Sequence, residues 1–158
     1  MSSSLKNLSE YDHASIPSGK GKKIGVVVAE WNQHITFELM KGCNETLLQH
    51  GILPEDIIIS FVPGTFELPF AAKMLAKANR LAGVVCIGCV IKGETKHDEY
   101  INHSVAQALQ NLNLQYDIPF IFGVLTPNSE QQAIDRAGGK YGNKGVEAAV
   151  TVLKMTAL

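Results

Sequence analysis

Acidic, basic and hydroxyl side chains gather at residues 92–99 (KGETKHDE), directly after an apolar run that ends at Ile91. This segment leaves an expected strand and enters an expected helix, so free backbone N–H groups meet the positive end of a helix dipole there. Gly93 permits close approach to the backbone, and the Thr95 hydroxyl can donate or accept a hydrogen bond. The pattern suits a phosphate seat, although it matches neither G-x-x-x-x-G-K-[ST] nor G-x-G-x-x-G. A capped helix start with a solvated acidic turn would look the same.

A proton-transfer residue is available in the same segment. Among the histidines, His97 alone is expected at this edge, because His13 falls in the N-terminal tail and the others fall within helices. An imidazole gains and loses protons near neutral pH without tuning, but a histidine at a helix start is also a common capping or surface residue. No second His, Cys or carboxylate stands with His97 at metal-ligand spacing. We therefore expect no metal and no cofactor.

Aromatic residues follow the first two strand-like runs, Trp31 after one and Phe66 after the other. Aromatic residues at such places usually cover a core, yet two beside polar loops could enclose a flat heterocycle. Glu67 stands in the first turn of an expected helix, where the dipole favours a carboxylate and where it could also accept hydrogen bonds from ligand hydroxyls. Arg136 and Lys144, late in the chain, are by default solvated helix charges.

Four apolar, β-branched runs form the framework for these residues. None alternates apolar with polar residues, so we expect each strand to be covered on both faces, as in a parallel sheet. Segments of helical period lie between the runs. This order predicts right-handed βαβ units and a three-layer α/β sandwich with a four-stranded parallel sheet. The expected strands are residues 23–29, 57–62, 83–91 and 119–125, and the expected helices are residues 33–50, 69–79, 100–112, 129–137 and 143–158.

The loops of this expected fold differ sharply between the two ends of the sheet. Those before the strands are plain turns (HGILPED, ANRLA and NLQYDIP), whereas those after the strands read AEWNQH, VPGTFELP, KGETKHDEY and LTPNSEQ. Ligands of such folds bind outside the carboxyl ends of the strands. The sequence therefore predicts a binding site at this edge, with residues 92–99 as one wall.

Composition excludes several classes of partner. The 158 residues carry a net charge of −1, so there is no basic field to attract nucleic acid or an anionic membrane. Only 18% of residues are charged and 46% are hydrophobic. Surface this apolar favours a homo-oligomer, in which part of it is buried against other copies.

Cysteine usage and the N-terminus indicate the compartment. Cys86 and Cys89 are spaced as C-x-x-C, but within a strand this spacing puts their side chains on opposite faces, so we expect buried thiols in a reducing environment. No apolar run reaches the roughly 20 residues of a membrane span, and the N-terminus lacks a secretory signal. We expect a cytoplasmic protein with a flexible tail or arm at residues 1–21 and one domain at residues 22–158.

Five motifs in order resemble those of the lumazine synthase family, from about Lys22 to the C-terminus: VPGTFELP, GCVIKGETKHDEY, IFGVLT, EQQAIDRAGG and GNKGVEAA. The resemblance implies a flavodoxin-like α/β sandwich that assembles as pentamers, often twelve of them in an icosahedral shell. It implies two small-molecule substrates and admits riboflavin synthase as a partner. The uninterrupted GGKYGNKG resembles the form in icosahedral members and so favours the sixty-subunit shell.

The resemblance also implies roles for particular residues. Trp31 stands where the family has an aromatic residue, usually Phe, that stacks on the pyrimidine ring. His97 matches the proton-transfer residue. Phe122, Arg136 and Lys144 match residues that the adjacent subunit contributes, and Arg136 would hold the phosphate and ease its departure.

The remaining substrate contacts are implied in the same way, by position in the motifs. Thr65 replaces a more usual Ala, Lys92 stands where Arg is common, and Asp98 takes the place of the aromatic residue that usually follows the histidine. The implied contacts are Thr65, Phe66 and Glu67 near the ribityl chain, Cys89, Val90 and Ile91 along the ring edge, and Glu94 and Thr95 at the phosphate turn. Asn32 and Lys92 complete the implied substrate contacts.

The implied reaction joins 5-amino-6-ribitylamino-uracil to 3,4-dihydroxy-2-butanone 4-phosphate and gives 6,7-dimethyl-8-ribityllumazine, with release of phosphate and water. The alternative is a storage shell that binds a flavin or lumazine without turnover. The phosphate turn, His97 and Arg136 favour the enzyme, because simple binding needs no proton transfer. A signalling receiver of similar fold is excluded, since the first strand ends in AEWN and not in a pair of acidic residues.

Overall fold

The computed structural model describes residues 7–158 and contains the predicted four-stranded parallel sheet. Its strand order is β2-β1-β3-β4, so β2 and β4 form the two edges. The chain pairs Ile24 with Ile57 across β1 and β2, and Val84 with Phe120 across β3 and β4. The strands are β1 (Ile24–Ala29), β2 (Ile57–Val62), β3 (Gly83–Cys89) and β4 (Phe120–Leu125).

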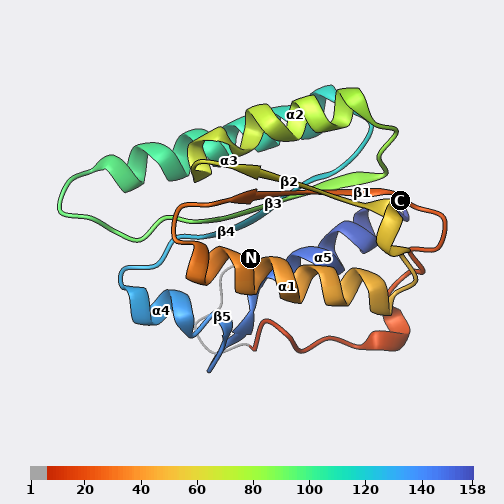
Figure 1. The fold of residues 1–158 in the computed structure, drawn as a ribbon, viewed down its shortest axis with the longest axis horizontal. Coiled ribbons are helices and arrows are strands. Elements are labelled where there is room, and N and C mark those ends of the chain that lie inside the picture. Colours follow the sequence, from red (N-terminus) through yellow and green to blue (C-terminus); the bar gives the residue numbers. More distant parts are fainter. Residues whose placement is uncertain (1–6) are drawn as a thin grey trace.

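Helices cover the sheet in two layers, which makes the fold the predicted three-layer sandwich (Figure 1). On one face α1 (Gln33–Gln49) and α5 (Lys144–Met155) pack together, and on the other face lie α2 (Leu68–Ala78) and α3 (His97–Gln115). The short α4 (Glu130–Ile134) follows β4. Short 3-10 turns complete the pattern at His13–Ser15, Pro54–Asp56 and Thr65–Glu67.

Each central strand supplies two separate cores, one under each helical layer. Val26 and Val28 of β1 face α1 and α5, whereas Val27 between them faces α2 and α3. Cys86 and Cys89 divide in the same way, which confirms that their side chains lie on opposite faces. Both are free thiols, and burial raises the pKa of each to about 12. These cysteines are therefore packing residues and not a reactive pair.

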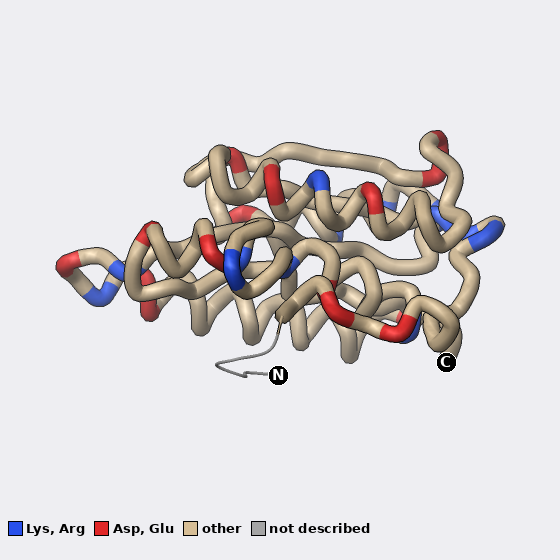
Figure 2. Tube along the Cα trace, turned by 90° about the horizontal axis from the view of Figure 1, so that it is seen from below, with Lys and Arg blue, Asp and Glu red and all other residues tan. Residues whose placement is uncertain are grey.

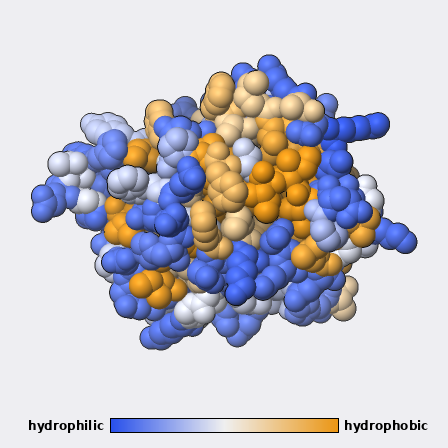
Figure 3. Space-filling model, viewed as in Figure 1, coloured by the Kyte–Doolittle hydropathy of each residue, from blue (hydrophilic) through white to orange (hydrophobic). Residues whose placement is uncertain are grey.

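Edge strand β2 departs from the prediction that every strand is covered on both faces. Ile59 is 36% exposed and Phe61 is 49% exposed, with the Phe61 ring 5.6 Å from that of Phe37. In this strand the apolar run is not a sign of full burial, because its own chain leaves the face that carries Ile59 and Phe61 partly open, whereas β4, the other edge strand, is buried at all positions but Phe122. Apolar surface consequently gathers between α1 and α2, over this edge of the sheet (Figure 3).

The glycine-rich segment between α4 and α5 folds as a small hairpin that was not predicted. Its strands are β5 (Ala137–Gly139) and β6 (Gly142–Asn143), and they pair antiparallel. Gly138 and Gly142 have φ values of 109° and 77°, a left-handed backbone that glycine adopts readily. The helix expected over residues 129–137 ends at Ile134, because the residues that follow lead into the hairpin.

The part of the expected tail that the structure describes lies against its own chain. Ile16 is buried in the core beneath α1 and α5, and Gly19 N–H donates to His50 O at 2.8 Å. Residues 1–6 lie outside the described residues. Within residues 7–158, none of the helices is both long and apolar enough to cross a membrane.

Candidate active site

A cavity of about 690 Å³ lies at the carboxyl-terminal edge of the sheet, where the loops after β1, β2 and β3 meet. Its size suits a small organic ligand, and its lining combines aromatic rings, an amide, carboxylates and an imidazole. The predicted contact residues that line it are Trp31, Asn32, Thr65, Phe66, Glu67, Cys89, Val90, Ile91 and His97.

Asn32 fixes the loop after β1. Its φ of 59° lies in the left-handed region, which asparagine tolerates better than most residues. The side-chain Nδ2 donates to Cys89 O at 2.9 Å and so joins the loop to the end of β3. Trp31 N–H donates to Pro63 O at 3.0 Å, which joins the loop to the end of β2. The indole of Trp31 is 72% exposed and can stack on a flat ring.

The turn Thr65–Glu67 supplies a second ring and a carboxylate. Phe66 is 60% exposed, and Glu67 is exposed beside it. Thr65 is buried, and its Oγ1 has no hydrogen-bond partner among the described residues. A Cβ on Gly88 of β3 would lie 2.6 Å from this oxygen. Gly88 therefore lets the turn pack directly on the sheet, which places Phe66 and Glu67 at the cavity.

His97 is the first residue of α3, and its exposed side chain lines the cavity together with Asp98. Tyr100 and Ile101, one turn further along α3, also line it and were not predicted as site residues. The helical repeat contained the signal, since residues three and four positions after His97 share its face. This face of α3 can present a proton-transfer group to a ligand held beside Trp31.

The expected phosphate turn stands at the rim. Lys92, Glu94 and Thr95 are exposed, and of this turn only Gly93 is among the residues that line the cavity. Lys92 N–H donates to Pro127 O at 2.9 Å, which joins the turn to the loop after β4. Charged residues of both signs follow one another along this loop between β3 and α3 (Figure 2).

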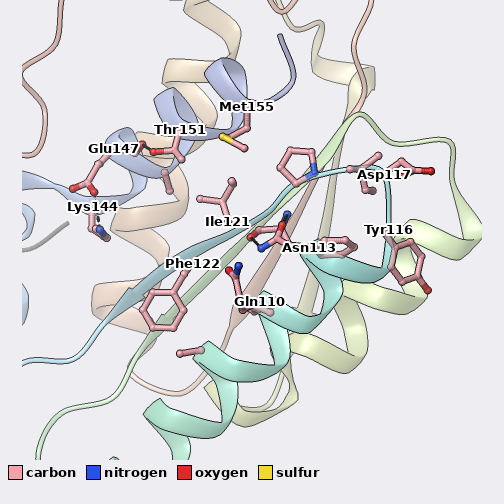
Figure 4. Close-up of a pocket in the computed structure, with 16 residues that line it drawn as sticks. Gln110, Asn113, Tyr116, Asp117, Ile121, Phe122, Lys144, Glu147, Thr151 and Met155 are labelled. Atoms are coloured by element: carbon pink, nitrogen blue, oxygen red, sulfur yellow. Dashed lines mark hydrogen bonds and ion pairs between the residues drawn. The ribbon is translucent and has the colours of Figure 1, made fainter. Parts of the chain in front are cut away.

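The structure does not bring Phe122, Arg136 or Lys144 into this cavity. Phe122 and Lys144 line a separate hollow of about 800 Å³ along edge strand β4, between α3 and α5 (Figure 4). There the Lys144 Nζ lies 2.8 Å from Glu147 Oε1. Arg136 follows α4, where its Nη1 donates to Gln132 O at 3.1 Å. Within one chain, these three predicted residues therefore lie apart from the predicted residues that line the cavity.

The expectation that His97 is the one histidine at this edge is wrong. His34 lies in the first turn of α1, directly after β1, and its Nε2 is 2.8 Å from Glu130 Oε1 at the start of α4. This contact joins the loops after the first and last strands of the sheet. It depends on how α1 and α4 pack in three dimensions, so no local pattern in the sequence predicts it.

These features define a class of protein: a flavodoxin-like α/β sandwich with a cavity at the carboxyl edge of its sheet, lined by aromatic rings, carboxylates and an imidazole. Comparison with known proteins gives the family. The model of the 6,7-dimethyl-8-ribityllumazine synthase family matches residues 21–158, and the chain belongs to this family.

Full-length relatives carry the same name. The 6,7-dimethyl-8-ribityllumazine synthase of Parabacteroides distasonis is 53% identical over 98% of this chain and 97% of its own length. The proteins of that name from Porphyromonas gingivalis and Cytophaga hutchinsonii are each 51% identical, over 100% and 99% of this chain and 98% of their own lengths. The resemblance in the sequence motifs is thereby confirmed.

Proposed function

We propose that the protein condenses 5-amino-6-ribitylamino-uracil with 3,4-dihydroxy-2-butanone 4-phosphate to 6,7-dimethyl-8-ribityllumazine, releasing phosphate and water. The observation that carries this proposal is the cavity in which Trp31, Glu67 and His97 meet, in a chain of this family. The reaction forms an imine between the amine and the ketone, expels the phosphate and closes the second ring.

The cavity suits the pyrimidine substrate. The rings of Trp31 and Phe66 offer flat surfaces for the heterocycle, and the Glu67 carboxylate can accept hydrogen bonds from the ribityl hydroxyls. Backbone groups of Val90 and Ile91 can contact the ring edge. His97 then moves protons during imine formation and ring closure, a contribution of about 10²–10⁴-fold to the rate. Holding the two reactants together supplies further acceleration.

We infer that a second copy of the chain completes the site. Phe122, Arg136 and Lys144 lie outside the cavity of their own chain, so they can serve it only from a neighbour. Arg136 then holds the phosphate of the second substrate together with the turn at Glu94 and Thr95. The exposed apolar residues at β2 support association, because surface of this kind is stabilised by burial.

The finer features of the assembly and location belong to the same proposal. The resemblance supports a pentamer, and the GGKYGNKG segment supports twelve pentamers in a sixty-subunit shell, with riboflavin synthase as a candidate partner and the cytoplasm as the location. Size-exclusion chromatography with light scattering separates a pentamer from a shell. A single pentamer as the largest species would overturn the proposed shell.

The experiment that tests the reaction follows product absorbance after both substrates are mixed with the protein. Enzymatic turnover gives product in large excess over protein, with one phosphate released for each lumazine formed. A storage shell binds added lumazine, seen as quenching of Trp31 fluorescence, and makes none. Binding without turnover would therefore refute the proposed reaction and establish the alternative.

A further inference from the structure

The β5–β6 hairpin fixes two cationic residues relative to each other. Lys144 N–H donates to Arg136 O at 2.9 Å, across the base of the hairpin. The Arg136 guanidinium lies over the ring of Tyr141, 4.9 Å from its centre, and Tyr141 N–H donates to Asp135 O at 2.7 Å. Any movement of the hairpin therefore moves Arg136 and Lys144.

Residues 7–16, which we name the N-terminal strap, hold this hairpin from outside. Leu8 N–H donates to Tyr141 O at 2.7 Å, and Asn143 N–H donates to the Ser9 hydroxyl at 2.9 Å. Asn7 Oδ1 accepts from Ser9 N–H at 2.9 Å, which shapes the strap where it meets the hairpin. On its other side Asn143 donates through Nδ2 to Glu38 O of α1, at 2.9 Å. The hairpin is thus held between α1 and the strap.

The strap is itself anchored far from the hairpin. It runs beneath α1, from β5 toward the far end of that helix (Figure 1). Tyr11 hydroxyl lies 3.3 Å from His50 Nε2, and the rings of Tyr11 and His13 are 4.3 Å apart. Ile16 is buried in the core. Because these contacts fix its path, the strap can resist displacement of the hairpin.

We propose that the N-terminal strap positions Arg136 and Lys144 for the reaction, with Ser9 as the positioning residue. This inference rests on the proposed function, in which both cations act in a neighbouring subunit's cavity. Ser9 touches neither cation. It acts through Asn143, the residue directly before Lys144, by giving its N–H an acceptor.

The test compares three substitutions within the strap. Ser9→Ala removes the acceptor for Asn143 N–H, and Ser9→Thr keeps a hydroxyl at the same place. Ser15→Ala is the matched control, because the Ser15 hydroxyl also makes one hydrogen bond, to Asp12 O at 2.7 Å, but does not touch the hairpin. Hydrogen exchange of the Tyr141 and Lys144 amides and steady-state kinetics with each substrate are measured for all three.

We expect Ser9→Ala to raise both exchange rates and the KM for the phosphate-bearing substrate about 3- to 10-fold, the factor that one lost hydrogen bond represents. Ser9→Thr should restore both, and Ser15→Ala should change neither. If exchange in Ser9→Ala stays as slow as in Ser15→Ala, the strap does not hold the hairpin and the proposal is wrong. Faster exchange with an unchanged KM also overturns the proposal, because the strap then holds the hairpin without positioning the cations for the reaction.

Failure of the proposed function can be distinguished from failure of the proposed role of the strap. If Arg136→Ala leaves the KM for the phosphate-bearing substrate unchanged, the role given to Arg136 is wrong whatever the strap does. The exchange rates still decide whether the strap holds the hairpin, since they are measured without substrate.

Discussion

Mixing two inactive variants tests whether each site is built from two chains. His97 lines the cavity of its own chain, whereas Arg136 lies outside it. His97→Ala should slow turnover roughly 10–10³-fold. Arg136→Ala should lower the rate by a similar factor when the phosphate-bearing substrate is at low concentration. If the site is shared, each site of a mixed oligomer takes residue 97 from one chain and residue 136 from the next.

The expected recovery follows from counting. In an equal and random mixture, half of the chains supply an intact His97 and half supply an intact Arg136. About one quarter of the sites at a head-to-tail interface then contain both residues, so the mixture should regain about one quarter of the wild-type rate. A site within one chain would regain nothing, because every chain lacks one of the residues.

A matched pair gives the control. His97→Ala and Glu67→Ala both alter the cavity of a single chain, so their mixture should stay as inactive as its parents. The assay follows lumazine absorbance after co-refolding, and native mass spectrometry of isotopically labelled chains verifies that mixed oligomers have formed. Mixed oligomers of His97→Ala and Arg136→Ala with only the activity of the parents would refute the shared site.

Three further predictions concern binding, packing and pH. Arg136→Ala should weaken binding of the phosphate-bearing substrate by about 1.5–3 kcal/mol and binding of the pyrimidine far less. Equal losses of binding in substrate titrations would show that Arg136 has a structural role instead. Gly88→Ala should lower the free energy of unfolding by about 1–3 kcal/mol, since its Cβ would meet Thr65 Oγ1. Thr65→Ala in the same chain should relieve much of this loss in urea unfolding, and no relief would place the clash elsewhere. Burial and the charge of His13 lower the pKa of His50, so the unfolded chain binds this proton more readily. The free energy of unfolding should therefore fall as the pH drops from about 6.5 to the lower pKa of His50 in the folded chain. His50→Gln should flatten this pH dependence, and an unchanged dependence would show that another group causes it.

Local pattern was enough to predict the sheet and most of the helices. The runs that became β1 and β3 are apolar at every position because both faces of these strands are buried, so their composition reports their place directly. The same rule overstated the burial of β2, whose Ile59 and Phe61 are as apolar as core residues yet lie exposed at an edge. Composition cannot distinguish burial within one chain from burial between chains.

The candidate site was predictable where its residues lie in the loops that follow the strands. Trp31, Glu67 and His97 could be placed at one edge because parallel strands bring their carboxyl ends together. The connections that hold these loops could not be predicted. Asn32 reaches Cys89 O from a left-handed backbone, and His34 meets Glu130 across the loops after β1 and β4. Such contacts depend on the packed structure and not on local pattern.

Two features of the single chain have one physical explanation if copies associate. Apolar side chains stand exposed at edge strand β2, and among residues 7–158 no Lys or Arg lines the cavity at the carboxyl edge, while Arg136 and Lys144 lie elsewhere, joined by a backbone hydrogen bond across the base of the hairpin. Burying an apolar surface stabilises an interface, and rigid cations at that interface reach a neighbour's ligand with little loss of conformational entropy. We therefore expect assembly and catalysis to be lost together when β2 is altered: Phe61→Glu should produce monomers that still fold, bind the pyrimidine weakly and form no product. Full turnover by such monomers would show that the cavity of one chain is sufficient.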